Sequence, residues 1–386
     1  MAEIIKPDLK FINEVIAGGG ESLKKCFQCA TCTVLCNVTP EEKPFPRKEM
    51  LHAQWGLKDK LFRNPDIWLC HQCSDCTAYC PRGAKPGEVL GAVRKLSLQH
   101  YSAPKFLAKA VGDPKYLILL LALPLLIFLG YLGLKGKLNF DNVPLDPEKG
   151  IAFSNLIPTT FFIDPVFILA AIFAAVVFVT GIRRYWKDMA QGGKVSGNIP
   201  ASIFDIVKEI LAHKRFGKCD VVKGRQLSHL FVFYSFVGLA ITTTIALVYL
   251  YGHEFFGIEG VPGILSFGTS PYPLTDPMKI IGNISAIALL VGIFLVIVNR
   301  FKNSEKAGVG SYYDWLFITV VFAIVVSGIL SEVFRLAGVA SLAYPIYITH
   351  LTAVFFLFAY SPFSKMAHMV YRTTAMVFAK VSGREK

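Results

Sequence analysis

Eight of the nine cysteines lie in two runs that share one spacing. Each run follows the pattern Cys-x2-Cys-x2-Cys-x3-Cys, and a proline follows the second run. Three thiols on one tight loop can reach three irons of a cubane cluster, while the fourth, displaced onto the next helical turn, can serve the neighbouring cluster. The sequence therefore predicts two [4Fe–4S] clusters. The expected ligand sets are Cys26, Cys29, Cys32 with Cys80, and Cys70, Cys73, Cys76 with Cys36.

Disulfides and zinc are the two other common uses of clustered cysteines. Disulfides are rare in the reducing cytoplasm, and zinc sites use pairs of cysteines rather than runs of four. Neither alternative fits as well as iron–sulfur clusters. Cys36 is followed by Asn37, where the fuller pattern has proline, although Pro40 lies close by. Cys219 stands alone in a basic segment, and we interpret it as an unligated side chain.

Histidines supply the second possible set of metal ligands. His229 opens one apolar run and His368 closes another, and two imidazoles from facing helices at one depth are what a low-spin haem b needs. His350 precedes His368 by 18 residues, which is five helical turns or about 27 Å, so one continuous helix would serve two haems. The expected partner of His350 is not obvious, because His253 lies too far along its helix. The other four, His52, His71, His100 and His213, are interpreted as surface or supporting residues.

Six apolar runs must position these histidines. Each is close to the roughly 20 residues that a membrane-spanning helix needs. They begin only after a polar stretch of ordinary soluble composition, so we divide the chain into a head (1–112) and a membrane domain (113–386). We expect an all-α protein: a helical ferredoxin-like head, with helices near 46–53 and 85–100, on a six-helix cytochrome b-type bundle. The runs are 116–134, 161–182, 229–251, 278–298, 313–334 and 344–360.

The formal charge of +13 is concentrated beside these runs. This is a sign of membrane topology rather than of nucleic-acid binding, because basic loops stay on the cytoplasmic side. The segment from Arg183 to Arg225 holds ten Lys and Arg residues, whereas 252–277 holds none. The first 21 residues also lack the features of a secretory signal. We therefore expect the head and both termini to lie in the cytoplasm and the protein to be multi-pass in the cytoplasmic membrane.

The motifs resemble two known families. The head, with CFQCATCTVLC, FPRKEM and CHQCSDCTAYCP, resembles the small iron–sulfur subunit of heterodisulfide reductases. The membrane half resembles the gamma subunit of respiratory nitrate reductase, through His229, His350, the Pro362-Phe363-Ser364 segment and His368. The fusion of both parts is similar to the membrane subunits of quinone-interacting membrane-bound oxidoreductase complexes. The nitrate reductase pattern has a second histidine ten residues after the first, a position that is Leu239 here.

The resemblance implies a path for electrons. They would pass from menaquinol through haem b and the two clusters to flavin-bearing and iron–sulfur heterodisulfide reductase-like partners, and on toward adenylylsulfate reductase. A quinone site needs a proton acceptor, for which Glu332, His253 and Glu254 are candidates, since ionisable groups near membrane spans are costly. Lys279 and Arg335 fit better as interface anchors.

Two other functions fit parts of the sequence. The chain could serve another heterodisulfide reductase-like or sulfite-reduction-linked complex, or it could be a transporter or a non-redox membrane anchor. Transporters tend to show internal repeats and broken helices, and no repeat is visible here. No Gly-rich dinucleotide fingerprint follows an expected strand. We therefore expect no complete enzyme activity from this chain alone.

Overall fold

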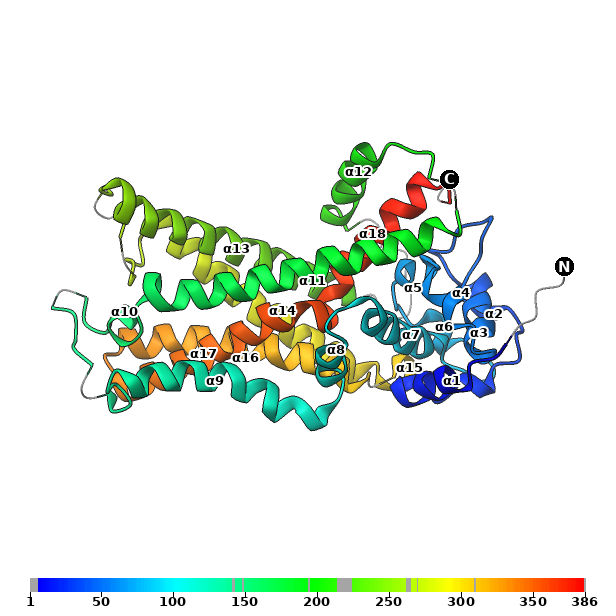
Figure 1. Cartoon of the computed structure of the whole chain (residues 1–386), viewed down its shortest axis with the longest axis horizontal. Helices are drawn as coiled ribbons and strands as arrows, with labels where there is room; N and C mark the ends of the chain where they lie inside the picture. Colours follow the sequence, from blue (N-terminus) through cyan, green and yellow to red (C-terminus); the bar gives the residue numbers. More distant parts are fainter. Residues whose placement is uncertain are drawn as a thin grey trace.

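The protein is elongated, with a compact head at one end and long helices running away from it (Figure 1). The structure is a computed structural model that describes residues 6–140, 143–147, 149–193, 195–213, 224–261, 265–268, 270–308 and 310–384. Cys219 lies outside these residues. Within them no β-strand occurs, and only two isolated bridges, Asp146–Gly150 and Val261–Leu265, are formed. The predicted all-α fold is confirmed.

In the part of the chain that the structure describes, six helices are long and apolar enough to cross a membrane. Each overlaps one of the predicted apolar runs, and most extend beyond it, because polar residues continue a helix that hydropathy alone cannot detect. The longest has 33 residues and is about 50 Å long, well beyond a hydrocarbon core of about 30 Å. The six are α9 (Leu117–Leu134), α11 (Asp164–Ala190), α13 (Gly224–Phe256), α14 (Pro277–Lys302), α16 (Tyr312–Leu336) and α17 (Ala340–Tyr360).

The head is built from short helices around one longer helix, α7 (Pro86–Tyr101). Both helices predicted in this part are present, α7 and α3 (Arg47–Gln54). Proline starts α7 at a position where its missing N–H costs no hydrogen bond. The remaining head helices are α1 (Leu9–Val15), α2 (Thr31–Val34), α4 (Lys58–Phe62), α5 (Asp66–Leu69), α6 (Asp75–Ala78) and α8 (Lys105–Val111).

The last span is not a continuous helix, which corrects the expectation drawn from the 18-residue step. Helix α17 ends at Tyr360, two short 3-10 turns follow, and Ser364 adopts an extended backbone. The final helix, α18 (His368–Val381), begins at the histidine itself. Pro362 lacks the N–H that would continue the helical hydrogen bonds. His350 and His368 therefore lie on separate helices, and the argument that they share one helical face does not hold.

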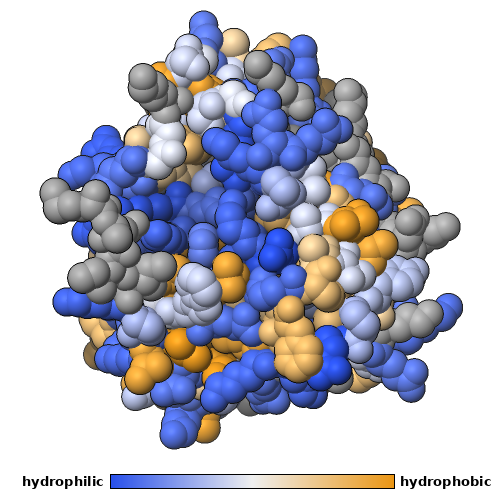
Figure 2. Space-filling view, turned by 90° about the vertical axis from the view of Figure 1, so that its right-hand side faces the viewer, coloured by the Kyte–Doolittle hydropathy of each residue, from blue (hydrophilic) through white to orange (hydrophobic). Residues whose placement is uncertain are grey.

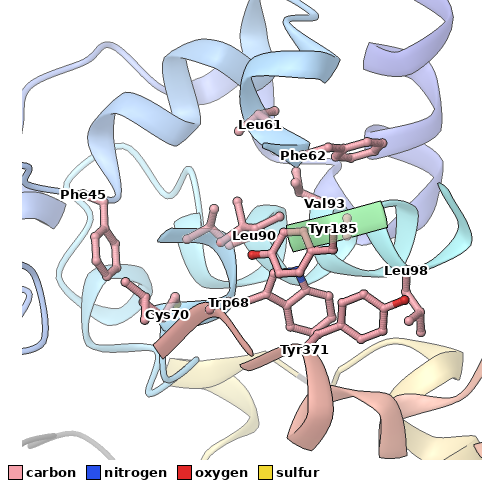
Figure 3. Packing of buried hydrophobic residues seen from close by; sticks show 14 of the residues in the cluster. Phe45, Leu61, Phe62, Trp68, Cys70, Leu90, Val93, Leu98, Tyr185 and Tyr371 are labelled. Carbon is pink, nitrogen blue, oxygen red and sulfur yellow. The ribbon is translucent and has the colours of Figure 1, made fainter. Parts of the chain in front are cut away.

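The head and the membrane helices share one hydrophobic core. Buried residues of α5 and α7 pack with the ends of α11, α12 (Ile199–Leu211) and α18. Figure 3 shows Trp68, Tyr185 and Tyr371 meeting at this junction, and the Trp68 and Tyr371 rings stack with their centroids 5.2 Å apart. The division at residue 112 stays a prediction, and the packing crosses it.

Candidate redox cofactor sites

The two cysteine loops share one backbone conformation. Gln28 and Ala30 in the first loop, and Gln72 and Ser74 in the second, all have positive φ. Each loop then continues into a one-turn helix, α2 or α6. Left-handed geometry at non-glycine residues costs about 1–3 kcal/mol and persists mainly where function requires it. The repeated strain indicates that both loops are shaped for the same kind of ligand.

Each loop surrounds a cavity and is joined there by a cysteine of the other run. Cys80 completes the first cavity and Cys36 completes the second, as the crossed ligand pattern predicts. Among the residues described, no three Cys, His, Asp or Glu side chains converge as ligands of a single metal ion. The thiols surround a space instead of meeting at a point. The two sets are Cys26, Cys29, Cys32 and Cys80, and Cys36, Cys70, Cys73 and Cys76.

The thiols fit a cluster in their chemistry as well as in their positions. All eight are free cysteines. Burial raises the pKa of Cys36 to about 12, and repulsion from Cys70 and Cys73 adds to it. Burial followed by the same two neighbours raises the pKa of Cys76 well above its ordinary value. Four clustered thiolates need a cationic centre to offset this repulsion, and iron would supply one. Their role as ligands stays a prediction.

Several N–H groups donate to the sulfurs, and such bonds tune cluster potentials. The Gln28 side chain lies 3.4 Å from Cys26 Sγ, and the Gln72 backbone N–H lies 3.4 Å from Cys70 Sγ. The Ala84 N–H lies 3.3 Å from Cys80 Sγ. Both cavities therefore have donors aimed at sulfur, although neither donor set was evident from the cysteine spacing.

The two cavities differ in exposure. Cys29 is exposed at the first, where Phe27 and Arg82 also face solvent and the guanidinium lies 4.1 Å from the phenyl centroid. At the second, Cys70 and His71 are less than one tenth exposed. One cysteine at the first cavity is therefore exposed, whereas none of the four at the second is.

The structure brings His229 of α13 close to His368 at the start of α18. His368, Arg225 and Arg372 all act electrostatically on His229. The His368 Nδ1 donates to the Lys365 carbonyl 2.5 Å away. This bond places the proton on Nδ1 and leaves the lone pair on Nε2, the arrangement expected of a histidine that ligates a metal.

His213 and His71 serve as supporting residues rather than surface residues. His213 is 4% exposed, and its Nε2 lies 3.1 Å from His229 Nδ1. His71, 7% exposed, contacts Arg372. The contact of His213 with His229 was not predicted, because it joins residues 16 positions apart and leaves no local pattern in the sequence. His52 and His100 are partly buried in the head.

His350 lies midway along α17 and contacts α16. Its Nδ1 donates to the Ile324 carbonyl at 3.0 Å and contacts Ser327 Oγ at 3.1 Å, so Nε2 again carries the lone pair. Leu239 packs against an apolar cluster of α14 and α16. Leu239, a packed apolar side chain, thus occupies the position where the nitrate reductase pattern has a second histidine.

The three candidate quinone residues each make polar contacts with different partners. Glu332 of α16 accepts from Lys279 of α14 at 2.8 Å and from Asn283 at 3.3 Å. His253 is exposed, with Nδ1 3.3 Å from the Ile258 carbonyl. The Glu254 carboxylate accepts from Thr160 at 2.9 Å. Lys279, expected as an interface anchor, is therefore an ion-pair partner.

These features define a class: a helical protein that carries a cysteine-rich dicluster head on a multi-pass membrane half. Residues 22–84 match the 4Fe-4S dicluster domain. The chain is 36% identical over 110 residues to one subunit of the H(2):CoB-CoM heterodisulfide,ferredoxin reductase of Methanothermobacter marburgensis, which is 28% of this chain and 57% of that protein. It is 35% identical over 85 residues, 22% of this chain, to a protein of Archaeoglobus profundus that is named for its likeness to a heterodisulfide reductase subunit, covering 45% of that protein.

A third relative extends the likeness beyond the head. One subunit of the dihydromethanophenazine:CoB--CoM heterodisulfide reductase of Methanosarcina thermophila is 26% identical over 214 residues, 52% of this chain and 75% of that protein. A match of this length cannot fit within the head alone. The chain spans about half the length of the first two relatives, and no solved structure matches it. The comparisons indicate an iron–sulfur electron-transfer role and a multi-pass membrane half.

Proposed function

We propose that this chain is the membrane-bound electron-transfer subunit of a respiratory complex. It passes electrons between menaquinol and cytoplasmic redox partners through haem b and two [4Fe–4S] clusters. The observation that carries the proposal is the arrangement of two crossed cysteine sets in a head that shares its core with the helix of His368 and is bonded to the helix of His229 through Arg225. When bound, the clusters and haem supply carriers that accept one electron at a time.

The head's own residues hold the clusters and offer one of them to a partner. In the set of Cys26, Cys29, Cys32 and Cys80, the exposed thiol is that of Cys29, and the neighbouring side chains of Phe27 and Tyr79 are exposed as well. Figure 2 views this end of the molecule, where apolar residues interrupt a largely hydrophilic face. We assign this face to the heterodisulfide reductase-like partners, flavin-bearing and iron–sulfur, that the resemblance implies. The distribution of basic segments supports a cytoplasmic position for this face.

In the membrane half, His229 and His368 hold the haem that lies nearer to the head. Support comes from their proximity and from the hydrogen bond that leaves His368 Nε2 with its lone pair. His350 has the same tautomer and would hold a second, outer haem together with a ligand other than Leu239. The outer position proposed for His350 follows from the membrane orientation that the basic loops predict.

The quinol site needs a group that takes a proton as quinol is oxidised. We propose Glu332 for this role, because Lys279 and Asn283 orient its carboxylate between α14 and α16. His253 is the weaker candidate, since it is exposed and its ring contacts the Ile258 carbonyl. Menaquinol as donor and adenylylsulfate reductase as the eventual acceptor follow from the resemblance.

One alternative has specific support. The Methanosarcina relative is named for dihydromethanophenazine, which favours another heterodisulfide reductase-like complex with a different membrane donor. That function would use the same clusters and histidines and would differ only at the donor site. The non-redox anchor has no such support.

The test is a dithionite-reduced minus oxidised visible spectrum of the purified complex, with haem quantified per chain. We expect a b-type spectrum in the wild type and loss of its inner-haem component in His229→Ala. If His350→Ala removes a further component, two haems are present, and if it changes nothing there is one. A wild-type complex without a b-type spectrum would contradict the haem proposal and leave a cluster protein on a membrane anchor.

A further inference from the structure

Each helix that carries an inner histidine also carries an arginine one turn away. Arg225 precedes His229 by four residues in α13, and Arg372 follows His368 by four residues in α18. Residues four apart lie on the same helical face. Each of the two helices therefore presents a histidine and an arginine side by side.

Both arginines reach the second cysteine loop. Arg372 Nη1 donates to the Cys70 carbonyl at 3.3 Å, and Nη2 donates to His71 Nε2. Arg225 Nη1 donates to the Gln72 carbonyl. Two segments distant in sequence thus bond to neighbouring residues of one loop.

A third arginine approaches the same loop from within the head. Arg94 of α7 lies 3.4 Å from the Cys70 carbonyl and 3.7 Å from its sulfur. The stack of Trp68 on Tyr371 fixes the chain just before the loop. The first loop is different, because the two guanidiniums that line its cavity, those of Arg47 and Arg82, belong to the head, and Arg82 lies over Phe27 at the exposed face.

We propose that Arg225 and Arg372 are positioning residues that hold the second cysteine loop against the two inner-histidine helices. The site of Cys36, Cys70, Cys73 and Cys76 is then the one that exchanges electrons with the membrane half, and the first site is the outer one. This inference rests on the proposed function. Each transfer would move one electron between the haem held by the inner histidines and the cluster held by the second cysteine set. No bond is made or broken.

The arginines also affect energetics. A cluster becomes more negative when it is reduced, and nearby positive charges favour that state. Three guanidinium groups at this loop therefore raise the reduction potential of the second cluster. Their charge favours acceptance of an electron from the membrane half at the second site.

The test is a potentiometric titration of both clusters in the purified complex, in which electron paramagnetic resonance measures the reduction of each cluster. Arg372→Gln and Arg225→Gln should each lower the potential of the same single cluster, by about a tenfold change in its reduction equilibrium, which is about 59 mV for a one-electron couple. Arg82→Gln is the matched control and should move only the other cluster. Arg372→Lys keeps the charge but loses the planar fork, so it should shift the potential less than Arg372→Gln.

Three outcomes would overturn the inference. These are two unchanged cluster potentials in both glutamine variants, a shift of the same signal by Arg82→Gln, and different clusters moved by Arg225→Gln and Arg372→Gln. If Arg372→Gln does not assemble, Arg225→Gln and Arg372→Lys carry the test. A wild-type complex without clusters would instead refute the proposed function, so the two failures can be told apart.

Discussion

At the scale of single residues, two carboxylates buried in the head are unusual. Glu49 of α3 and Asp66 of α5 are both 0% exposed. Lys48 lies 3.1 Å from Asp66 and 3.4 Å from Glu49, and Arg384 near the C-terminus also pairs with Asp66. Buried charges are tolerated when paired and hydrogen-bonded, but Glu49 Oε2 has no partner among the described atoms.

This arrangement makes stability depend on pH. Burial, and then repulsion from Asp66, raises the pKa of Glu49 to about 7. The unfolded chain releases this proton near pH ~4.3, so between these values the folded state binds more protons and stability falls as pH rises. Glu49→Gln keeps the shape without the charge, so it should be more stable than the wild type at about pH 8, by up to about 3 kcal/mol, and close to it at about pH 4.

Thermal unfolding midpoints measured across this pH range check the prediction. Glu41→Gln, a change at an exposed carboxylate of the head, is the control and should follow the wild type. Parallel pH curves for Glu49→Gln and the wild type would contradict the account.

At the scale of elements, α13 and α14 pack through small residues. A Cβ added to Gly238 would lie 2.1 Å from Ser285 Oγ, and one added to Gly292 would lie 2.8 Å from Phe231 Cβ and 2.9 Å from the Val232 nitrogen. Small residues let membrane helices approach closely. This contact positions the helix that carries His229.

Gly292→Ala should therefore push α13 away from α14. We expect a loss of about 1–3 kcal/mol from overpacking and an altered haem spectrum, because Val232 lies three residues from His229. Gly130→Ala in α9 is the matched control, since its added Cβ meets nothing within 4 Å, and it should be neutral or gain up to about 1 kcal/mol. Unfolding midpoints in detergent measure both, and equal destabilisation by the two variants would count against the prediction.

The elements also show what the sequence could and could not predict. Hydropathy is a local property, so all six spans were predictable. Cysteine spacing is local as well, and it predicted the crossed grouping around the two cavities. The break between α17 and α18 was not predicted, because the periodicity of the two histidines suggested one helix while Pro362 and Ser364 favour an interruption.

At the scale of the whole molecule, the head is packed onto the membrane half. Tyr185, Met189 and Tyr371 lie in the same buried cluster as Phe11 and Leu90 of the head. Contacts such as Arg372 with Cys70 join residues 302 positions apart. Such contacts leave no local pattern, which is why the arginines and His213 could not be assigned from sequence.

The central claim is that electrons pass between a membrane carrier and the clusters by way of the inner histidines. We would reduce the clusters of the complex in liposomes that contain menaquinone, remove excess reductant, and follow reoxidation by electron paramagnetic resonance. The account predicts fast reoxidation in the wild type, and in His229→Ala, whose cysteine sets are unchanged, reoxidation slower by at least about tenfold. Equal rates in the two proteins would contradict it, because the electrons would then leave the clusters without using the histidine site.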